Sequence, residues 1–226
     1  MSQWSEFTSA LLAFFVLHSI PVRPAVKSRI VSLIGSRPFT LAYSGVSLLA
    51  LGWLIVAASR APYIELWPPS PWQHLTALAI MLGVCIIFAF TLGRPNPFSF
   101  GGSSRTSFDP ARAGIVRLHR HPLLLAFFLW AIAHMIANGD LAHVIVFGLF
   151  AGFSLLGMKL INRRTRRQLG ASEYEAARTS MKQTSVVQGF ALDHPLIRFV
   201  AGICLYIALV FLHPLALGVS PLAVLY

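Results

Sequence analysis

Six long stretches of the chain are almost purely apolar, and more polar segments separate them. They cover about residues 5–22, 39–59, 72–92, 122–138, 141–161 and 195–217. Each has the roughly 17–25 residues that a helix needs to cross the hydrocarbon core of a bilayer. Because a helix satisfies its own backbone hydrogen bonds in lipid, the pattern predicts an all-α polytopic membrane bundle of about six transmembrane helices.

The polar connections between these spans differ in character. Residues 62–71, PYIELWPPSP, form a proline-stiffened loop, and residues 93–116 form the most irregular one. Only about residues 138–140 join the fourth span to the fifth, which predicts a tight antiparallel helical hairpin. No internal repeat or second domain is visible, so residues 1–226 are expected to form one integral membrane domain.

A helix end and a helix start are predicted just after the fifth span. The fifth helix should continue through INRRTRRQL and stop at Gly170, because glycine commonly ends helices. Ser172 with Glu175 three residues later has the spacing of a capping box, which predicts the start of a short surface helix.

Composition supports a membrane protein. The chain is 56% hydrophobic and 11% charged, with a mean hydropathy of +0.71. These values are too apolar for an ordinary soluble domain.

The net charge of +11 would suggest a nucleic-acid partner if the protein were soluble. However, 17 of the 18 Lys and Arg residues fall in alternate connections, between residues 23–37, 94–120 and 159–198. Such a bias orients membrane proteins with their basic loops in the cytoplasm. We therefore expect both termini on the outer side and no nucleic-acid partner.

Two histidines lie well inside apolar spans, where an ionisable group is costly and often marks function. His18 shares a helical face with aromatic residues such as Phe14 and Phe15. His134 shares one with Trp130 and Asn138, among others. An aromatic lining suits a flat apolar cofactor, so metal or haem ligation is one interpretation. Plain packing with a hydrogen bond across helices is the other.

A further histidine, His121, stands between Arg120 and Pro122 at the start of the fourth span. Thirteen residues separate it from His134, which is about 220° around a helix, so the two face apart. His121 and Arg120 belong to the inner mouth of the bundle. They fit either a catalytic pair or a basic membrane-surface anchor followed by a proline at the first helical turn.

Three blocks of sequence carry a family resemblance. They are HSIPVRPAVKSRIVSLIGSRPFTLAYSGVSL at 18–48, RLHRHPLLLAFFLWAIAHMIANGDLA at 117–142, and NRRTRRQLG with RTSMKQTSV at 162–186. In their order and spacing the chain resembles the NnrU family of bacterial membrane proteins. More distantly it resembles the plastid 15-cis-zeta-carotene isomerase.

The resemblance implies a location in the bacterial inner membrane and a link to denitrification. NnrU proteins are associated with production of nitrite and nitric oxide reductase activity. The isomerase relative binds haem b through histidine and moves a double bond in a carotenoid. By position its haem-linked histidines match His18 and His134, and its arginine-histidine-proline motif matches Arg120 and His121. A further histidine of a relative falls on Phe153 here, which weighs against isomerase activity.

A second resemblance supports a different function. Membrane methyltransferases that modify isoprenylcysteine or small thiols share Arg120, His121 and Pro122. Asn162 and Arg163 stand where those enzymes have a glutamate pair that helps hold S-adenosylmethionine. This departure ranks methyl transfer second, and an assembly factor without a cofactor is the third alternative.

The resemblance implies haem b with His18 and His134 as iron ligands, and helical spacing adds Trp130 and Asn138 beside His134 as cofactor-binding residues. Straight helices with the expected boundaries would place these two histidines about 13 Å apart in depth, and His18 and His121 about 7 Å apart, so the partner of His18 stays open. Arg120 and His121 are the expected catalytic residues, or would hold a haem propionate or an anionic headgroup. Expected partners are the lipid bilayer, a lipid or isoprenoid substrate, and denitrification enzymes or their assembly factors.

Overall fold

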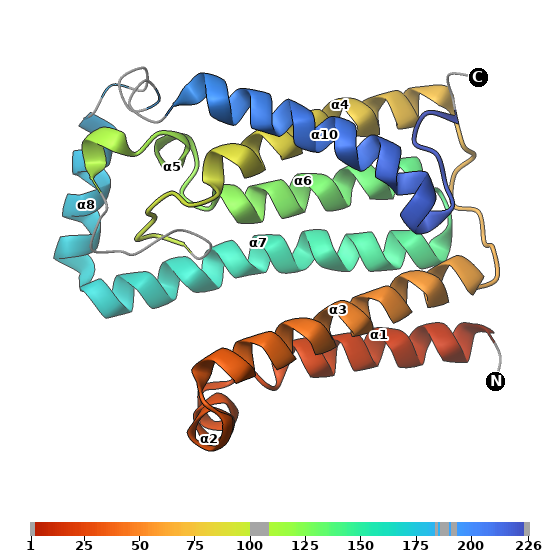
Figure 1. Cartoon of the computed structure of the whole chain (residues 1–226), viewed down its shortest axis with the longest axis horizontal. Coiled ribbons are helices and arrows are strands. Elements are labelled where there is room, and N and C mark those ends of the chain that lie inside the picture. Colours follow the sequence, from red (N-terminus) through yellow and green to blue (C-terminus); the bar gives the residue numbers. More distant parts are fainter. Residues whose placement is uncertain (1–2, 100–108, 184, 186–189, 191–193, 224–226) are drawn as a thin grey trace. The chain divides into compact units, whose positions relative to one another are not determined.

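The computed structural model describes residues 3–99, 109–183, 185, 190 and 194–223 (Figure 1). Within these residues it contains helices and no β-strand, apart from an isolated bridge between Glu65 and Asp140. The elements are α1 (Gln3–Ser19), α2 (Pro24–Ile34), α3 (Ser36–Arg60), α4 (Pro71–Thr91), η2 (Pro110–Arg112), α5 (Ile115–Leu118), α6 (Pro122–Ala137), α7 (Leu141–Leu169), α8 (Ala171–Gln183) and α10 (Pro195–Leu217). The expected all-α membrane fold is confirmed.

Four of these helices, α3, α4, α7 and α10, are long and apolar enough to cross a membrane. A fifth span results if α1 and α2, which are bent by 73° at a short break, are counted together. Helix α6 is apolar but has 16 residues, or about 24 Å, which is less than the roughly 30 Å of a hydrocarbon core. The count of six and the outer position of the termini stay predictions.

The first expected span, about residues 5–22, corresponds to α1, which ends at Ser19. A separate helix, α2, follows at residues 24–34. Two prolines in SIPVRP explain the break, because each disfavours a helical conformation in the residue before it. Pro24 then occupies the first turn of α2, where its missing N–H costs nothing.

The expected end of the fifth span is confirmed, but the expected capping box is wrong. Helix α7 runs to Leu169, and Gly170 follows with a φ of 86°, a conformation that favours glycine. The N–H of Tyr174 donates to the Gly170 carbonyl at 3.1 Å. Helix α8 therefore starts at Ala171, directly after Gly170, and Ser172 lies inside its first turn instead of capping it.

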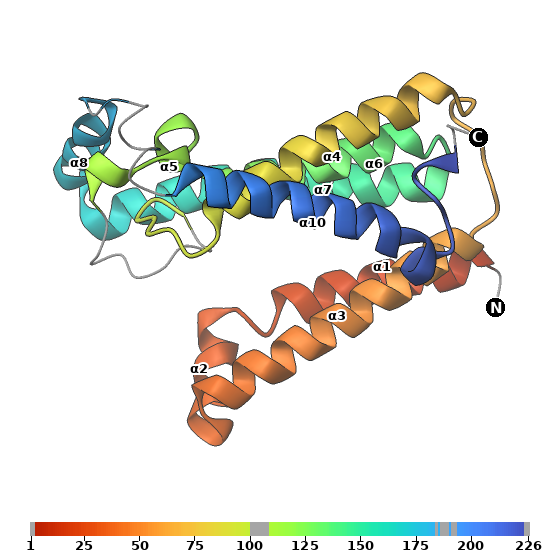
Figure 2. The ribbon, with the colours of Figure 1, turned by 45° about the horizontal axis from the view of Figure 1, so that its top comes forward.

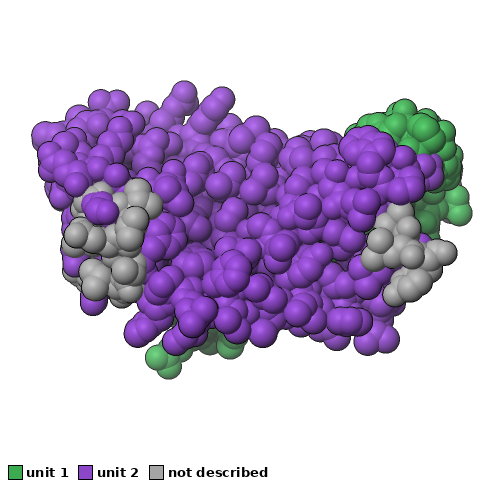
Figure 3. Space-filling model, turned by 90° about the horizontal axis from the view of Figure 1, so that it is seen from above, with its two compact units in different colours: residues 1–68, 139–146 green, residues 69–138, 147–226 purple. Residues whose placement is uncertain are grey.

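The chain divides into two compact units, shown in Figure 3. Unit 1 comprises residues 1–68 and 139–146, and unit 2 comprises residues 69–138 and 147–226. In unit 1, α1 and α3 lie side by side, and α2 lies at the turn between them (Figure 1). The core of unit 1 includes Phe7, Phe14 and Leu54.

A backbone contact in unit 1 fixes the segment before α7 to the long proline-rich loop. The N–H of Leu66 donates to the Gly139 carbonyl at 2.7 Å, and the N–H of Leu141 donates to the Ile64 carbonyl at 2.9 Å. A Cβ atom at position 139 would lie 2.1 Å from the Trp67 carbonyl oxygen. Glycine is therefore required here by the close approach of two backbones.

Unit 2 is built on α4, α6, most of α7, and α10, which run alongside one another in Figures 1 and 2. Opposed residues confirm the expected α6–α7 hairpin. Trp130 lies against Phe150, Leu124 lies closest to Gly157, and His121 contacts Asn162. The two residue numbers of each pair add up to nearly the same total, as expected when two helices run antiparallel.

The two ends of unit 2 differ. The α8 end carries α5, α8 and an apolar cluster that includes Phe90, Phe98, Val116, Tyr174 and Met181. We call the opposite end, where α6 ends, the hairpin end. Between the two ends, α10 approaches α4 closely at Gly202. A Cβ atom at this position would lie 2.9 Å from the Ile86 Cα.

Candidate functional site

At the α8 end, a cluster of polar side chains surrounds the expected catalytic pair. We call Asn96, Arg120, His121, Asn162 and Tyr174 the Asn162 cluster. His121 is only 3% exposed, and its Nε2 donates to the Asn162 Oδ1 at 3.0 Å. The Tyr174 hydroxyl donates to the same oxygen at 3.1 Å and accepts a hydrogen bond from Arg120. One amide oxygen therefore joins α6, α7 and α8.

Pro122 and the loop before α6 explain why His121 is buried. His121 precedes the first turn of α6, and Pro122 fixes the direction in which the helix leaves the loop. The Asn96 side chain donates to the Arg120 carbonyl at 3.0 Å and holds the loop from the other side. The Nδ1 of His121 is buried and has no hydrogen-bond partner among the described residues.

Burial lowers the pKa of two basic side chains at the α8 end, His121 and Arg94. It lowers the pKa of His121 below the ordinary value of 6.5, and the charges of His119 and Arg120 lower it further, while the Asn162 bond opposes the shift. Burial also lowers the pKa of Arg94, to about 10, with a contribution from Arg198. His121 is thus neutral at pH 7, whereas Arg94 is still cationic.

This arrangement bears on methyl transfer. The position that the methyltransferase resemblance pairs with His121 does lie beside it, because Asn162 is 3.0 Å away. However, an asparagine there is uncharged, and its oxygen already accepts from His121 and Tyr174. Arg163 next to it is exposed and cationic. The carboxylates that would attract a cationic cofactor are replaced by a neutral amide and a positive charge.

His134 has a different environment at the hairpin end. It lies in the last turn of α6, with its ring centre 5.0 Å from that of Trp130 and 5.0 Å from that of Phe147. Its Nδ1 donates to the Trp130 carbonyl at 2.8 Å. The Asn138 side chain donates to the His134 carbonyl at 2.8 Å and so caps the helix. Trp130 and Asn138, expected beside a cofactor, both contact His134.

The other expected ligand, His18, lies in unit 1 near the end of α1. Its ring stacks on Phe14, with ring centres 5.3 Å apart and an interplanar angle of 12°. The Tyr43 hydroxyl donates to the His18 carbonyl at 3.0 Å and lies 3.3 Å from its Nδ1. Because that hydroxyl has one proton, Nδ1 acts as the donor in the second contact. Within unit 1, His18 is an exposed residue of α1.

Sequence reasoning missed a third histidine. The ring centre of His213 lies 6.4 Å from that of His134, with an interplanar angle of 28°. Its Nδ1 donates to the Val219 carbonyl at 2.7 Å. The chain returns to His213 because Gly218 ends α10 with a φ of 72°. A glycine a few residues after a histidine is the sole sequence signal for this contact.

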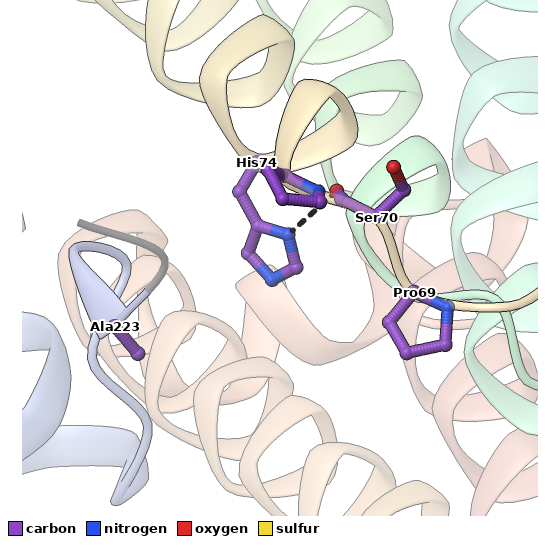
Figure 4. Close-up of a pocket in the computed structure, with 5 residues that line it drawn as sticks. Pro69, Ser70, His74 and Ala223 are labelled. Carbon is purple, nitrogen blue, oxygen red and sulfur yellow. Dashed lines mark hydrogen bonds between the residues drawn. The ribbon is translucent and has the colours of Figure 1, made fainter. Parts of the chain in front are cut away.

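A small hollow of about 250 Å³ lies elsewhere on unit 2, lined by Pro69, Ser70, Pro71, His74 and Ala223 (Figure 4). There the Nδ1 of His74 donates to the Ser70 carbonyl at 3.4 Å. Among the described residues, no group of three or more His, Cys, Asp or Glu side chains could hold a metal ion.

Comparison with known proteins identifies the family. The NnrU protein family matches residues 6–221, nearly the whole chain. No curated protein and no solved structure gives a significant match. With its apolar helices and the family pattern running from α1 to the end of α10, the chain belongs to the NnrU family.

Proposed function

We propose that this protein binds haem b in the bacterial inner membrane and has a redox or nitric-oxide-linked role in support of denitrification enzymes. The environment of His134 carries the proposal. This histidine of an apolar helix lies against Trp130 and Phe147, Phe150 packs on Trp130, and its Nδ1 is anchored on a backbone carbonyl. Family membership is consistent with the denitrification role.

The hydrogen bond of His134 gives the ring the character of a metal ligand. A carbonyl oxygen can only accept, so Nδ1 carries the proton, and in the neutral ring Nε2 carries the lone pair. Histidines that bind metals usually have their second nitrogen fixed in this way. Bound haem would supply an iron centre for electron transfer or nitric oxide binding, and its potential would depend on axial ligands and burial.

The Asn162 cluster lies too far from His134 to hold a propionate of the same haem. Thirteen residues of helix between His121 and His134 correspond to about 20 Å, which exceeds the reach of a propionate from its iron. Arg120 and His121 therefore act separately, as a structural cluster or as a site for an anionic lipid headgroup at the membrane surface.

Absorption spectroscopy of detergent-purified protein tests the proposal. Wild-type protein should show a Soret band, and His134→Ala should lose it. His74→Ala is a matched control, because His74 also donates from Nδ1 to the carbonyl four residues before it. A wild-type protein that is colourless and takes up no added haem would overturn the proposal.

The same experiment tests His18, the second iron ligand implied by the resemblance. Loss of the Soret band in His18→Ala as well as in His134→Ala, with the band kept in His74→Ala, would support that assignment. An isomerase-like reaction on a lipid or isoprenoid would then require product analysis with the haem-loaded protein. Binding of S-adenosylmethionine in a calorimetric titration would instead favour the methyltransferase alternative.

A further inference from the structure

We propose that His213 is the imidazole that shares one metal centre with His134, and that this centre is the haem iron. The inference rests on the proposed function and names the ligand opposite His134. It arises from a contact between two helices, α6 and α10, whose histidines are 79 positions apart in the chain.

The separation of the two rings fits a shared ion. An imidazole nitrogen binds a metal at about 2.0–2.1 Å and lies about 1 Å from its ring centre. Two imidazoles on opposite sides of one ion therefore have ring centres about 6 Å apart. The observed distance between the ring centres of His134 and His213 is 6.4 Å.

In both rings the same nitrogen, Nδ1, is fixed by a hydrogen bond to the backbone. The Nδ1 of His134 donates to Trp130, and the Nδ1 of His213 donates to Val219, each to a backbone carbonyl. Each neutral ring therefore carries its lone pair on Nε2, the nitrogen that would bind iron. These two hydrogen bonds also restrict how the rings can turn. The carbonyl that holds His134 belongs to α6 itself, and the carbonyl that holds His213 follows Gly218, where α10 ends.

Two histidines suit haem better than a bare ion. A bare zinc or copper ion usually takes three or four protein ligands, and in the part of the chain described no group of three or more His, Cys, Asp or Glu side chains is placed to hold a metal ion. In haem the porphyrin supplies four nitrogens, so two imidazoles complete the coordination.

The surroundings of the pair are apolar and reachable from the side of the bundle. Leu209 and Leu217 share the helical face of His213 and are 43% and 47% exposed. Phe127, two turns before His134 on α6, is 48% exposed. In a membrane these side chains face lipid or a bound apolar group, so a porphyrin can reach the pair from the bilayer.

The test compares spin states of the haem-loaded, detergent-purified protein. Two axial imidazoles give a six-coordinate low-spin iron, and loss of one gives a five-coordinate high-spin iron. We expect His213→Ala to turn the spectrum high-spin, while His74→Ala stays low-spin. His213→Met should restore a low-spin spectrum with a higher midpoint potential, because a Met/His pair raises it. A merely structural role of His213 would not give this rescue.

The outcomes separate this inference from the proposed function. A Soret band that stays low-spin in His213→Ala but changes in His18→Ala would overturn the inference and leave haem binding intact. If wild-type protein takes up no haem, the proposed function fails, and Cu²⁺ alone then probes the pair by electron paramagnetic resonance. Nitrogen couplings from two imidazoles that are lost in His213→Ala would still support a shared centre, and their absence in wild type would overturn it.

Discussion

Two histidines at opposite ends of α6, His121 just before its first turn and His134 in its last, show how the surroundings determine what an imidazole does. At the α8 end, His121 is almost fully buried, and its Nε2 bonds to the Asn162 side chain within a polar cluster. At the hairpin end, His134 is half-buried among aromatic rings, its Nδ1 bonds to its own helix, and a second imidazole lies beside it. The first histidine belongs to a polar cluster in which the Asn162 oxygen joins α6, α7 and α8, whereas the second lies beside another imidazole.

The largest effect on stability is expected from Asn162→Leu. This change removes the acceptor shared by His121 and Tyr174 and leaves two buried donors unsatisfied. It should lower the free energy of unfolding by about 2–4 kcal/mol, measured by denaturant unfolding in detergent. Arg163→Leu is the matched control, because Arg163 is the exposed neighbour and should change stability little.

Asn162→Leu also sharpens the comparison between the two ends. If the ends act separately, protein that survives purification should keep the haem spectrum of wild type. A variant that is as stable as wild type would show that the Asn162 cluster does not hold the helices together. If the variant has normal stability but loses the haem band, the haem binds at the α8 end and not at the hairpin end as proposed.

A smaller effect is expected from Gly202→Leu, at the close approach of α10 to α4. The added side chain would meet the Ile86 backbone, so the helices must move apart at a cost of about 1–3 kcal/mol. The shift should also displace His213 from His134 and turn the haem spectrum partly high-spin. Gly83→Leu on α4 is the control, because nothing lies within 4 Å of the Cβ position there. Equal effects of the two changes would argue against a close contact at Gly202.

Much of the helical framework could be predicted, since it depends on local pattern. Residues 195–217 form α10 as expected, and α7 ends at Gly170 as expected. The differences from expectation lie at helix ends, where proline or glycine residues decide where a helix stops or starts. The prolines of SIPVRP end α1 early, and Gly170 begins α8 before Ser172 can cap it.

The candidate site could be predicted only in part. Helical spacing placed Trp130 and Asn138 beside His134, because neighbours within one helix follow from periodicity. The contact of His134 with His213 joins two helices whose relative rotation no single-helix pattern contains. The bond between His121 and Asn162 likewise depends on how α6 and α7 pair, although the methyltransferase resemblance pointed to position 162.

The smallest effect that we expect is a pH dependence of stability that comes from His121 at the α8 end. Burial lowers the pKa of His121 in the folded protein, whereas the unfolded chain keeps the ordinary value of about 6.5. Above pH 6.5 both states are neutral, so His121 imposes no penalty there. As the pH falls below 6.5, the unfolded state takes up the proton first, and stability declines until the pH passes the folded pKa.

We therefore expect the thermal midpoint in detergent to fall between pH 7 and pH 5, and to fall less in His121→Gln. The neighbouring His119, whose pKa is lowered mainly by burial, adds to the same trend, and His119→Gln measures its share. A wild-type midpoint that rises on acidification would mean that His121 gains a negative partner in the folded protein. The α8 end would then be an anion site in its own right, and its contrast with the hairpin end would no longer hold.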